Sequence, residues 1–241
     1  MKADRKETVR EATEGARKRA IAALDSREVL ENRAAERPIV KELAQLGYRI
    51  ESLADLPSQG KTWKSAIPIL LEWLTKTDNL DVKNAIVGCL SVPWLRGAGT
   101  ALLIEQFKKY AVIPDPPGSW IELSEKEKQE RSSALLAWTI GNALSVVDIR
   151  GFEGEIIDLC RNTAFGTARR MIVVRLAKLK DLNAEETALD LLDDKDVRPH
   201  AVTALGKMKS RRALRRLEEL LADNSSLVRR EARRAIKNIA K

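Results

Sequence analysis

The sequence predicts an all-α protein in which helical pairs stack along the chain. Three observations predict it. The residues that dominate the 241-residue chain are Ala, Leu, Glu, Lys and Arg, all of which favour helix. Apolar residues recur at steps of three and four, the spacing of one helix face. The pattern of apolar helix, polar turn and second apolar helix then recurs along the chain, which is typical of a solenoid.

The first 60 residues are expected to be helical but out of register with the repeat. Helices are expected near residues 3–24 and 26–47. Their charged residues supply the polar outer face that the end of a repeat array needs. We therefore interpret residues 1–60 as an N-terminal helical cap. Its opening stretch lacks the apolar core of a secretory signal.

The stretch DLPSQGKT at the end of this cap resembles the end of a phosphate-binding loop. A nucleotide loop needs G-x-x-x-x-G-K-[ST] after a buried strand. Asp55 stands where the first glycine is required and places a negative charge where phosphate would lie. The proline and glycine of this stretch instead predict a connection between helices, with Thr62 or Ser65 capping the next helix.

The repeat itself is clearest near the C-terminus. Ala201 and Ala204 in one second helix correspond to Ala232 and Ala235 in the next, 31 residues further on. Since one helical pair cannot bury both of its faces, stacked pairs are expected to share a continuous core. The dipeptides near the start of the second helices are Val82-Lys83, Ala168-Arg169, Val197-Arg198 and Val228-Arg229.

A proline-rich segment, VIPDPPGSWIELSEKE at residues 112–127, interrupts the array. Its prolines forbid helix, and Ser124 with Glu127 forms a capping box that starts the next helix. We expect this loop to lie within the third helical pair. Because inserted loops often carry function, Trp120 is a candidate aromatic anchor for a partner. The alternative is that its ring folds back onto the solenoid.

These units resemble HEAT repeats over roughly residues 63–241. The resemblance rests on the turn residues Asp194 and Asp223 and on the pattern of the first unit, which is Ile67-Pro68, Leu70, Leu71, Leu74, Asp78 and Val82-Lys83. A looser resemblance, through YRIESLADL and SVPWLRGAG, is to bacterial HEAT-repeat proteins. The resemblance implies a curved, right-handed α-solenoid whose second helices line the concave side. It also implies that Arg198 and Arg229 bond a neighbouring turn aspartate. We expect one domain over residues 1–241, with HEAT-like repeats at 61–241.

The net charge of +8 lies entirely at the C-terminus, because residues 205–241 hold 12 Lys and Arg against 4 Asp and Glu. Such a segment is a candidate for phosphate contacts with duplex nucleic acid. The alternative is a polar C-terminal cap. All ten aromatic residues lie at or before Phe165, so the basic segment offers no stacking platform for bases. The candidate nucleic-acid-binding residues are Arg211, Arg212, Arg215, Arg216, Arg229, Arg230, Arg233 and Arg234.

The sequence holds little that indicates catalysis. His200 is the only histidine, which excludes a multi-histidine metal site. Cys89 and Cys160 lie in apolar helical patterns and are interpreted as core residues in a reducing cytosol. Trp73 and Trp138 fit apolar stripes and are interpreted as core too. We expect no cofactor, metal or small-molecule substrate, and no apolar stretch is long enough to span a membrane.

We therefore expect a non-enzymatic, cytoplasmic scaffold that binds another protein through its concave face or its inserted loop. Duplex nucleic-acid binding is the alternative, and a HEAT-like DNA glycosylase is a more distant one. The candidate partner-binding residues are Arg169, Arg170, Arg198 and His200 on second helices, and Trp120 in the loop.

Overall fold

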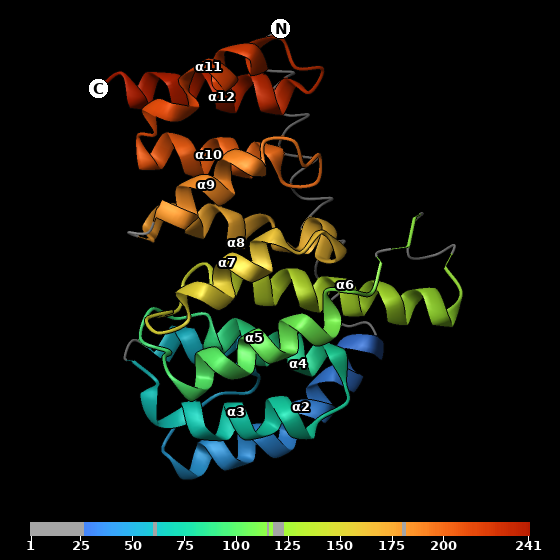
Figure 1. The fold of residues 1–241 in the computed structure, drawn as a ribbon. Coiled ribbons are helices and arrows are strands. Elements are labelled where there is room, and N and C mark those ends of the chain that lie inside the picture. Colours follow the sequence, from blue (N-terminus) through green and yellow to red (C-terminus); the bar gives the residue numbers. More distant parts are fainter. Residues whose placement is uncertain (1–26, 60–61, 115, 118–122, 180–181) are drawn as a thin grey trace, which may run out of the picture. The chain divides into compact units, whose positions relative to one another are not determined.

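The computed structural model describes residues 27–59, 62–114, 116–117, 123–179 and 182–241. Within these ranges every regular element is a helix, which confirms the all-α prediction (Figure 1). The helix expected near 3–24 and the anchor candidate Trp120 lie outside the described residues. The chain forms two compact units, one ending at Ile69 and one running from Leu70 to Lys241. The single domain over residues 1–241 stays a prediction.

The first unit is built on helix α2 (Arg27–Gln45), which confirms the helix expected near 26–47. Two short 3₁₀ helices follow, η1 (Leu53–Gln59) and η2 (Lys64–Ala66). Ile39 and Leu43 of α2 are fully buried. The buried carboxylate of Glu36 accepts the backbone N–H of Leu53 at 2.8 Å, and burial raises its pKa. This bond ties the start of η1 to α2.

Asp55 acts as a turn residue in this unit. Its carboxylate accepts the backbone N–H groups of Glu51 at 3.0 Å and Ser52 at 2.9 Å, and these bonds lower its pKa. This carboxylate thus lies where a phosphate loop would need glycine. The expected cap at Thr62 or Ser65 is wrong, because η2 begins without a side-chain cap and the Ser65 hydroxyl bonds that of Tyr48 at 2.7 Å.

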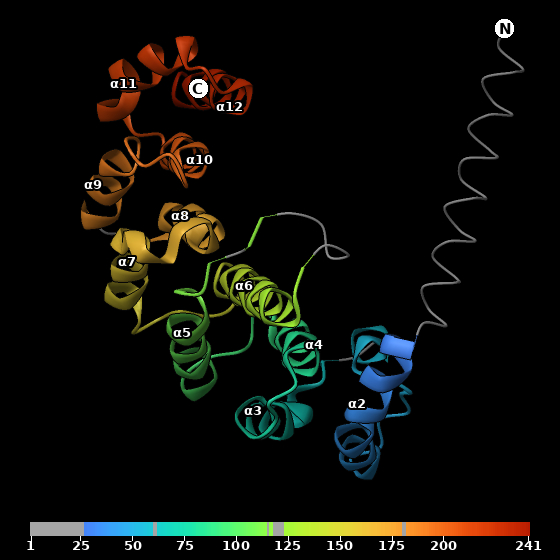
Figure 2. The same ribbon diagram turned by 90° about the vertical axis from the view of Figure 1, so that its right-hand side faces the viewer.

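The second unit consists of successive helical pairs. Figure 2 shows α7, α9 and α11 in one row and α8, α10 and α12 in the row beside it. We call α4, α6, α8, α10 and α12 the second-helix row, since each contacts the next. The helices are α3 (Ile67–Lys76), α4 (Leu80–Leu90), α5 (Ala98–Tyr110), α6 (Glu125–Leu144), α7 (Glu153–Arg161), η4 (Thr163–Arg169), α8 (Arg170–Arg175), η5 (Leu176–Lys178), α9 (Leu182–Asp190), α10 (Arg198–Met208), η6 (Arg211–Ala213), α11 (Leu214–Glu219), η7 (Leu220–Ala222) and α12 (Ser226–Ile239).

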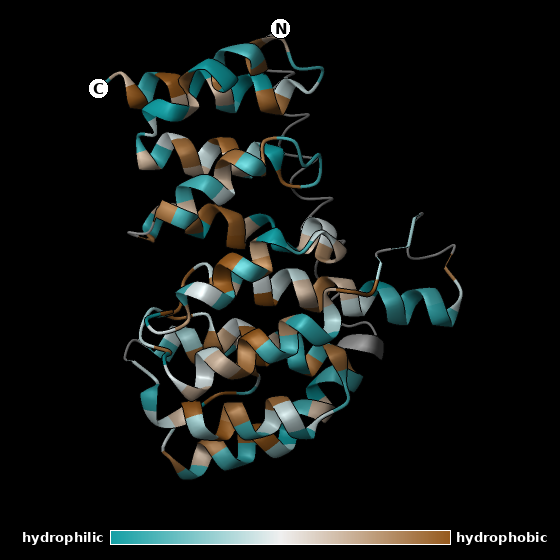
Figure 3. Ribbon diagram, in the orientation of Figure 1, coloured by the Kyte–Doolittle hydropathy of each residue, from teal (hydrophilic) through white to brown (hydrophobic). Residues whose placement is uncertain are grey.

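The buried stripes follow the predicted repeat register. Ala201 and Ala204 of α10 and Ala232 and Ala235 of α12 are all buried, as the 31-residue correspondence predicts. Figure 3 shows hydrophobic and hydrophilic residues alternating along the helices, as expected where each helix buries one face. No helix among the described residues is long and apolar enough to cross a membrane.

Two glycines allow the second-helix row to pack closely. A Cβ atom on Gly206 of α10 would lie 2.7 Å from the Cα of Ala235 in α12. A Cβ atom on Gly141 of α6 would lie 2.6 Å from the carbonyl oxygen of Ala168 in η4. Both distances are below van der Waals contact, so backbone would have to move to admit a methyl group.

The loop within the third pair ends as predicted. Ser124 Oγ accepts the N–H of Glu127, and the Glu127 carboxylate accepts the N–H of Ser124 at 2.9 Å. This capping box starts α6 at Glu125. The next second helix is interrupted instead, because Gly166 adopts φ 45° inside η4 and kinks the segment that leads into α8.

We predict that Gly206→Ala lowers the free energy of unfolding by about 1–3 kcal/mol, because the added methyl group overpacks the α10–α12 contact. Gly88→Ala in α4 is the matched control. No atom lies within 4 Å of its Cβ position, so alanine should stabilise the helix there by about 0.5–1 kcal/mol. Urea unfolding of both variants measures the difference, and effects of the same sign and size would contradict the close contact.

Candidate functional site

The arginine at the start of a second helix bonds the turn of the following repeat. Arg169 Nη2 forms an ion pair with Asp194 Oδ2 at 2.5 Å. The same guanidinium donates through Nη1 to the carbonyl of Cys160 at 2.7 Å and through Nε to that of Gly166 at 3.1 Å. It therefore joins the end of its own first helix to the turn of the next repeat.

Arg198 repeats this arrangement one unit later. Its Nη1 pairs with Asp223 Oδ2 at 2.8 Å, and its Nε donates to the carbonyl of Leu192 at 2.6 Å. In both pairs the carboxylate lies 25 residues after the arginine. We call the pairs Arg169–Asp194 and Arg198–Asp223 the arginine ladder. Lys83 occupies the same position in α4, where its buried ammonium donates to the carbonyl of Leu74.

The ladder corrects part of the predicted partner-binding set. The Arg169 side chain is fully buried, so the prediction that it contacts a partner is wrong. Arg198 is 22% exposed and held by Asp223, which confirms the role that the family resemblance implied. Arg229 differs, because its Nη1 donates to the backbone carbonyls of Asp223 and Asn224 at 2.7 and 2.9 Å. The expected bond to a turn carboxylate is therefore replaced there by backbone contacts.

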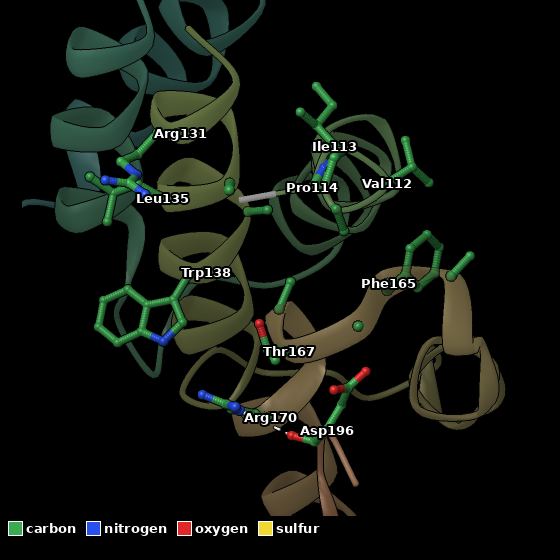
Figure 4. A pocket seen from close by; sticks show the side chains of 16 residues that line it. Val112, Ile113, Pro114, Arg131, Leu135, Trp138, Phe165, Thr167, Arg170 and Asp196 are labelled. Carbon is green, nitrogen blue, oxygen red and sulfur yellow. Dashed lines mark hydrogen bonds between the residues drawn. The ribbon is translucent and has the colours of Figure 1, made fainter. Parts of the chain in front are cut away.

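A groove of about 720 Å³ opens beside α6, and we call it the α6 groove (Figure 4). It is lined by the segment 111–114 after α5, by one face of α6, by residues 164–168 and by Arg170. Asp196 closes it from the next turn. The described part of the inserted loop thus lines the same groove as two second helices.

The α6 groove exposes large apolar side chains. Val112 is 56% exposed, Leu135 43% and Trp138 50%. The sequence-based assignment of Trp138 to the core is therefore wrong. The core face of α6 is formed by other residues, Leu136 and Ile140 among them, and both are fully buried. The signal that could have revealed the exposed face is a second stripe at Arg131, Leu135 and Trp138, spaced by four and three residues.

Two guanidinium groups are fixed around this apolar surface. Arg170 Nε donates to the backbone carbonyl of Asp196 at 3.0 Å. Arg131 Nη2 donates to the backbone carbonyl of Pro116 in the inserted loop. Arg170 is exposed, unlike its neighbour Arg169, so it stays a candidate for partner contact.

His200 lies in the second-helix row one repeat after Arg170. Its ring is half-buried, and its Nδ1 atom finds no hydrogen-bond partner among the described residues. Burial lowers its pKa, as does Arg170 from α8, while Glu231 from α12 acts in the opposite direction. His200 therefore interacts with both neighbouring second helices, and its role as a partner contact stays a prediction.

We call α7, α9 and α11 the first-helix row. The eight C-terminal arginines lie in both helix rows, with η6 leading into α11. In the first-helix row, Arg212 pairs with Glu185 at 3.3 Å and Arg216 with Asp193 at 2.7 Å, which joins η6 and α11 to the preceding repeat. Arg215 pairs with Glu219 within α11, and Arg211 is exposed.

On α12 two of the four remaining arginines lie beside one carboxylate. Arg230 and Arg234 lie 3.2 and 4.0 Å from Glu231, and Arg233 is exposed. Three arginines at the start of the basic segment thus make ion pairs in the first-helix row. Two more make ion pairs on α12, and Arg229 donates to backbone carbonyls. Duplex nucleic-acid binding by this set stays a prediction.

The cysteines are core residues, as expected. Cys89 and Cys160 are buried and form no disulfide, and burial raises the pKa of the Cys160 thiol far above its ordinary value. A thiol of this kind stays protonated and unreactive. In the described ranges no group of three or more His, Cys, Asp and Glu residues could hold a metal ion.

Comparison with known families agrees with this geometry. Residues 155–237 match the family model of HEAT repeats. The match covers about a third of the chain, from α7 to α12, and this stretch is therefore similar to HEAT repeats. The HEAT segment begins in α7 and includes the arginine ladder, Arg170 and Asp196. No curated protein and no solved structure matches the chain.

We predict that Asp194→Ala lowers the free energy of unfolding by about 3–5 kcal/mol, since it leaves Arg169 buried without a counter-charge. Glu219→Ala removes the partner of the exposed Arg215 and should cost less than about 1 kcal/mol. Denaturant unfolding of both variants provides the comparison. Similar losses would show that the ladder contributes no more than a surface pair.

We also predict that His200 makes the fold less stable as the pH falls. Because its folded pKa lies below the ordinary 6.5, the unfolded chain binds more protons between these two values. The free energy of unfolding should therefore be highest above the unfolded pKa and decrease as pH falls through that window. His200→Gln should remove this part of the slope, measured by urea unfolding between about pH 7.5 and 5.5. An unchanged slope would contradict the assignment.

Proposed function

We propose that this protein is a non-enzymatic scaffold that binds a partner protein in the α6 groove. The observation that carries the proposal is the exposure of Trp138, Leu135 and Val112 on one surface. Large apolar side chains that remain open to solvent together in a concavity are typical of interaction sites. HEAT repeats commonly serve as protein-interaction scaffolds, which agrees with this use of the fold.

The geometry supports a site that is ready to bind. Trp138 and Leu135 belong to a regular helix, whose other face is anchored in the core through Leu136 and Ile140. A partner would therefore meet an aromatic anchor whose backbone is already ordered, and little conformational entropy would be lost on binding. Among the described lining residues Asp196 is the one acidic group, and no His, Cys or Lys stands beside it as a catalytic partner.

The α6 groove combines the two binding surfaces that the sequence suggested, the second helices and the inserted loop. Segment 111–114 leads into the inserted loop, and α6 and α8 belong to the second-helix row. A partner seated between them would contact both at once. Cys89 and Cys160 are buried and form no disulfide, which supports a cytoplasmic location, where thiols are kept reduced.

The DNA glycosylase alternative gains one observation from the groove. A glycosylase of this kind needs an acidic residue that faces a solvent-exposed tryptophan. Asp196 lines the same groove as the half-exposed Trp138. Release of an alkylated base from a DNA duplex, abolished by Asp196→Asn, would replace the scaffold proposal with an enzymatic one.

The proposal predicts site-specific crosslinking in the native cell. A photoreactive phenylalanine analogue at position 138 should give discrete protein adducts, because this side chain is half exposed within the groove. The matched control is the same analogue at Leu182, which is 82% exposed at the start of α9 in the first-helix row. Gel mobility and mass spectrometry identify the adducts. The proposal fails if position 138 gives none, or gives the same adducts as position 182.

A further inference from the structure

We propose that the α6 groove selects a partner segment in which an apolar side chain stands between two carboxylates. This inference rests on the proposed function and specifies the chemistry of its partner. It is carried by the placement of two arginines around the apolar strip formed by Leu135 and Trp138. Figure 4 shows Arg131, Leu135 and Trp138 in that order along α6, with Arg170 of α8 beyond Trp138.

The spacing of these groups defines the length of the segment. Arg131 precedes Trp138 by seven residues in α6, which is about 10 Å along the helix axis. Arg170 extends the row from α8, beyond Trp138. An extended peptide advances about 3.3 Å per residue. Because Arg170 lies beyond Trp138, acidic residues more than about three positions apart would reach the two guanidinium groups while an apolar residue between them covers Trp138.

The charge of the groove favours an acidic partner. Its described lining contains two guanidinium groups and one carboxylate, that of Asp196. Arg170 is exposed and makes no ion pair with any residue that the structure describes; its hydrogen bond goes to the backbone carbonyl of Asp196. A guanidinium held in place by a carbonyl is pre-oriented, and its remaining N–H groups suit the two oxygens of a carboxylate.

The neighbouring repeat adds to this preference. His200 lies close enough to Arg170 for this guanidinium to lower the pKa of the imidazole, and Glu231 acts on that pKa in the opposite direction. A carboxylate bound at Arg170 would thus meet further positive charge whenever His200 is protonated. The same site would repel a basic segment.

The apolar lining favours a peptide over nucleic acid. Beside Trp138 it consists mainly of aliphatic side chains, among them Val112, Ile113, Pro114 and Leu135, and the other aromatic ring of the lining, Phe165, is buried. Single strands of nucleic acid bind through successive exposed aromatic platforms on which bases stack. One exposed indole among aliphatic groups fits a single leucine or aromatic anchor, which is typical of peptide recognition.

The test is a selection of displayed random peptides of about twelve residues on the full-length protein. We expect the selected peptides to share a leucine or aromatic residue with Asp or Glu on both sides. Their synthetic forms should bind Trp138→Ser and Arg170→Glu at least about tenfold more weakly, because these variants remove the anchor contact and reverse one cation. Exchanging the facing acid for lysine should restore binding to Arg170→Glu.

The matched control for the charge reversal is Arg161→Glu. Arg161 is exposed on α7 in the first-helix row, so the variant changes net charge equally without touching the groove. Its affinity for the peptides should equal that of the wild type. Thermal unfolding of each variant verifies that it is folded.

The possible outcomes separate the two proposals. Peptides that need Trp138 but carry no acidic residues would overturn this inference and leave the scaffold proposal intact. An absence of peptides that depend on Trp138 would contradict both. A DNA duplex of about 20 base pairs, titrated over a salt series, provides the remaining comparison. If the duplex binds through Arg170 and the peptides do not bind, the groove is a nucleic-acid site and the inference is wrong.

Discussion

The fold of the second unit depends on a charge placed inside it. An arginine is a costly group to bury, and Arg169 is buried completely. It is stable there because each edge of its guanidinium meets an oxygen, two from its own repeat and one from the turn of the next. The arginine ladder thereby fixes how far one second helix is displaced from the following one. A solenoid needs such a restraint, because apolar stripes alone permit helices to slide.

The α6 groove is a consequence of this restraint. Asp194 receives Arg169, and two residues later the backbone of Asp196 receives Arg170. One turn therefore anchors a structural arginine and orients an exposed one. Gly141 completes the arrangement, because it lets the η4 backbone approach α6 closely at Ala168. The chemistry of the site is thus positioned by the elements that hold the repeats in register.

The sequence predicted the helices well because their signals are local. Periodicity, the Ser124–Glu127 capping box and the Val-Arg dipeptides each act within one or two turns. The identity of the exposed residues depended on tertiary structure and was harder to predict. Arg169 and Arg170 are adjacent and chemically identical, yet the first is buried and the second is exposed, a difference that no local pattern distinguishes. Trp138 follows an apolar pattern that looks like core, and its exposure arises because no helix of the described chain covers the second stripe of α6.

Helix α6 is 20 residues long, whereas α8 in the next repeat has six. In Figure 1 its N-terminal half extends past its neighbours toward the inserted loop. Within residues 125–134 only Ser133 is buried, so the loop could be lengthened, shortened or replaced in related chains while the register of the repeats stays unchanged. The array would then evolve slowly and the loop quickly. A family built on this plan could acquire new partners by exchanging one short segment at a fixed position on a conserved frame.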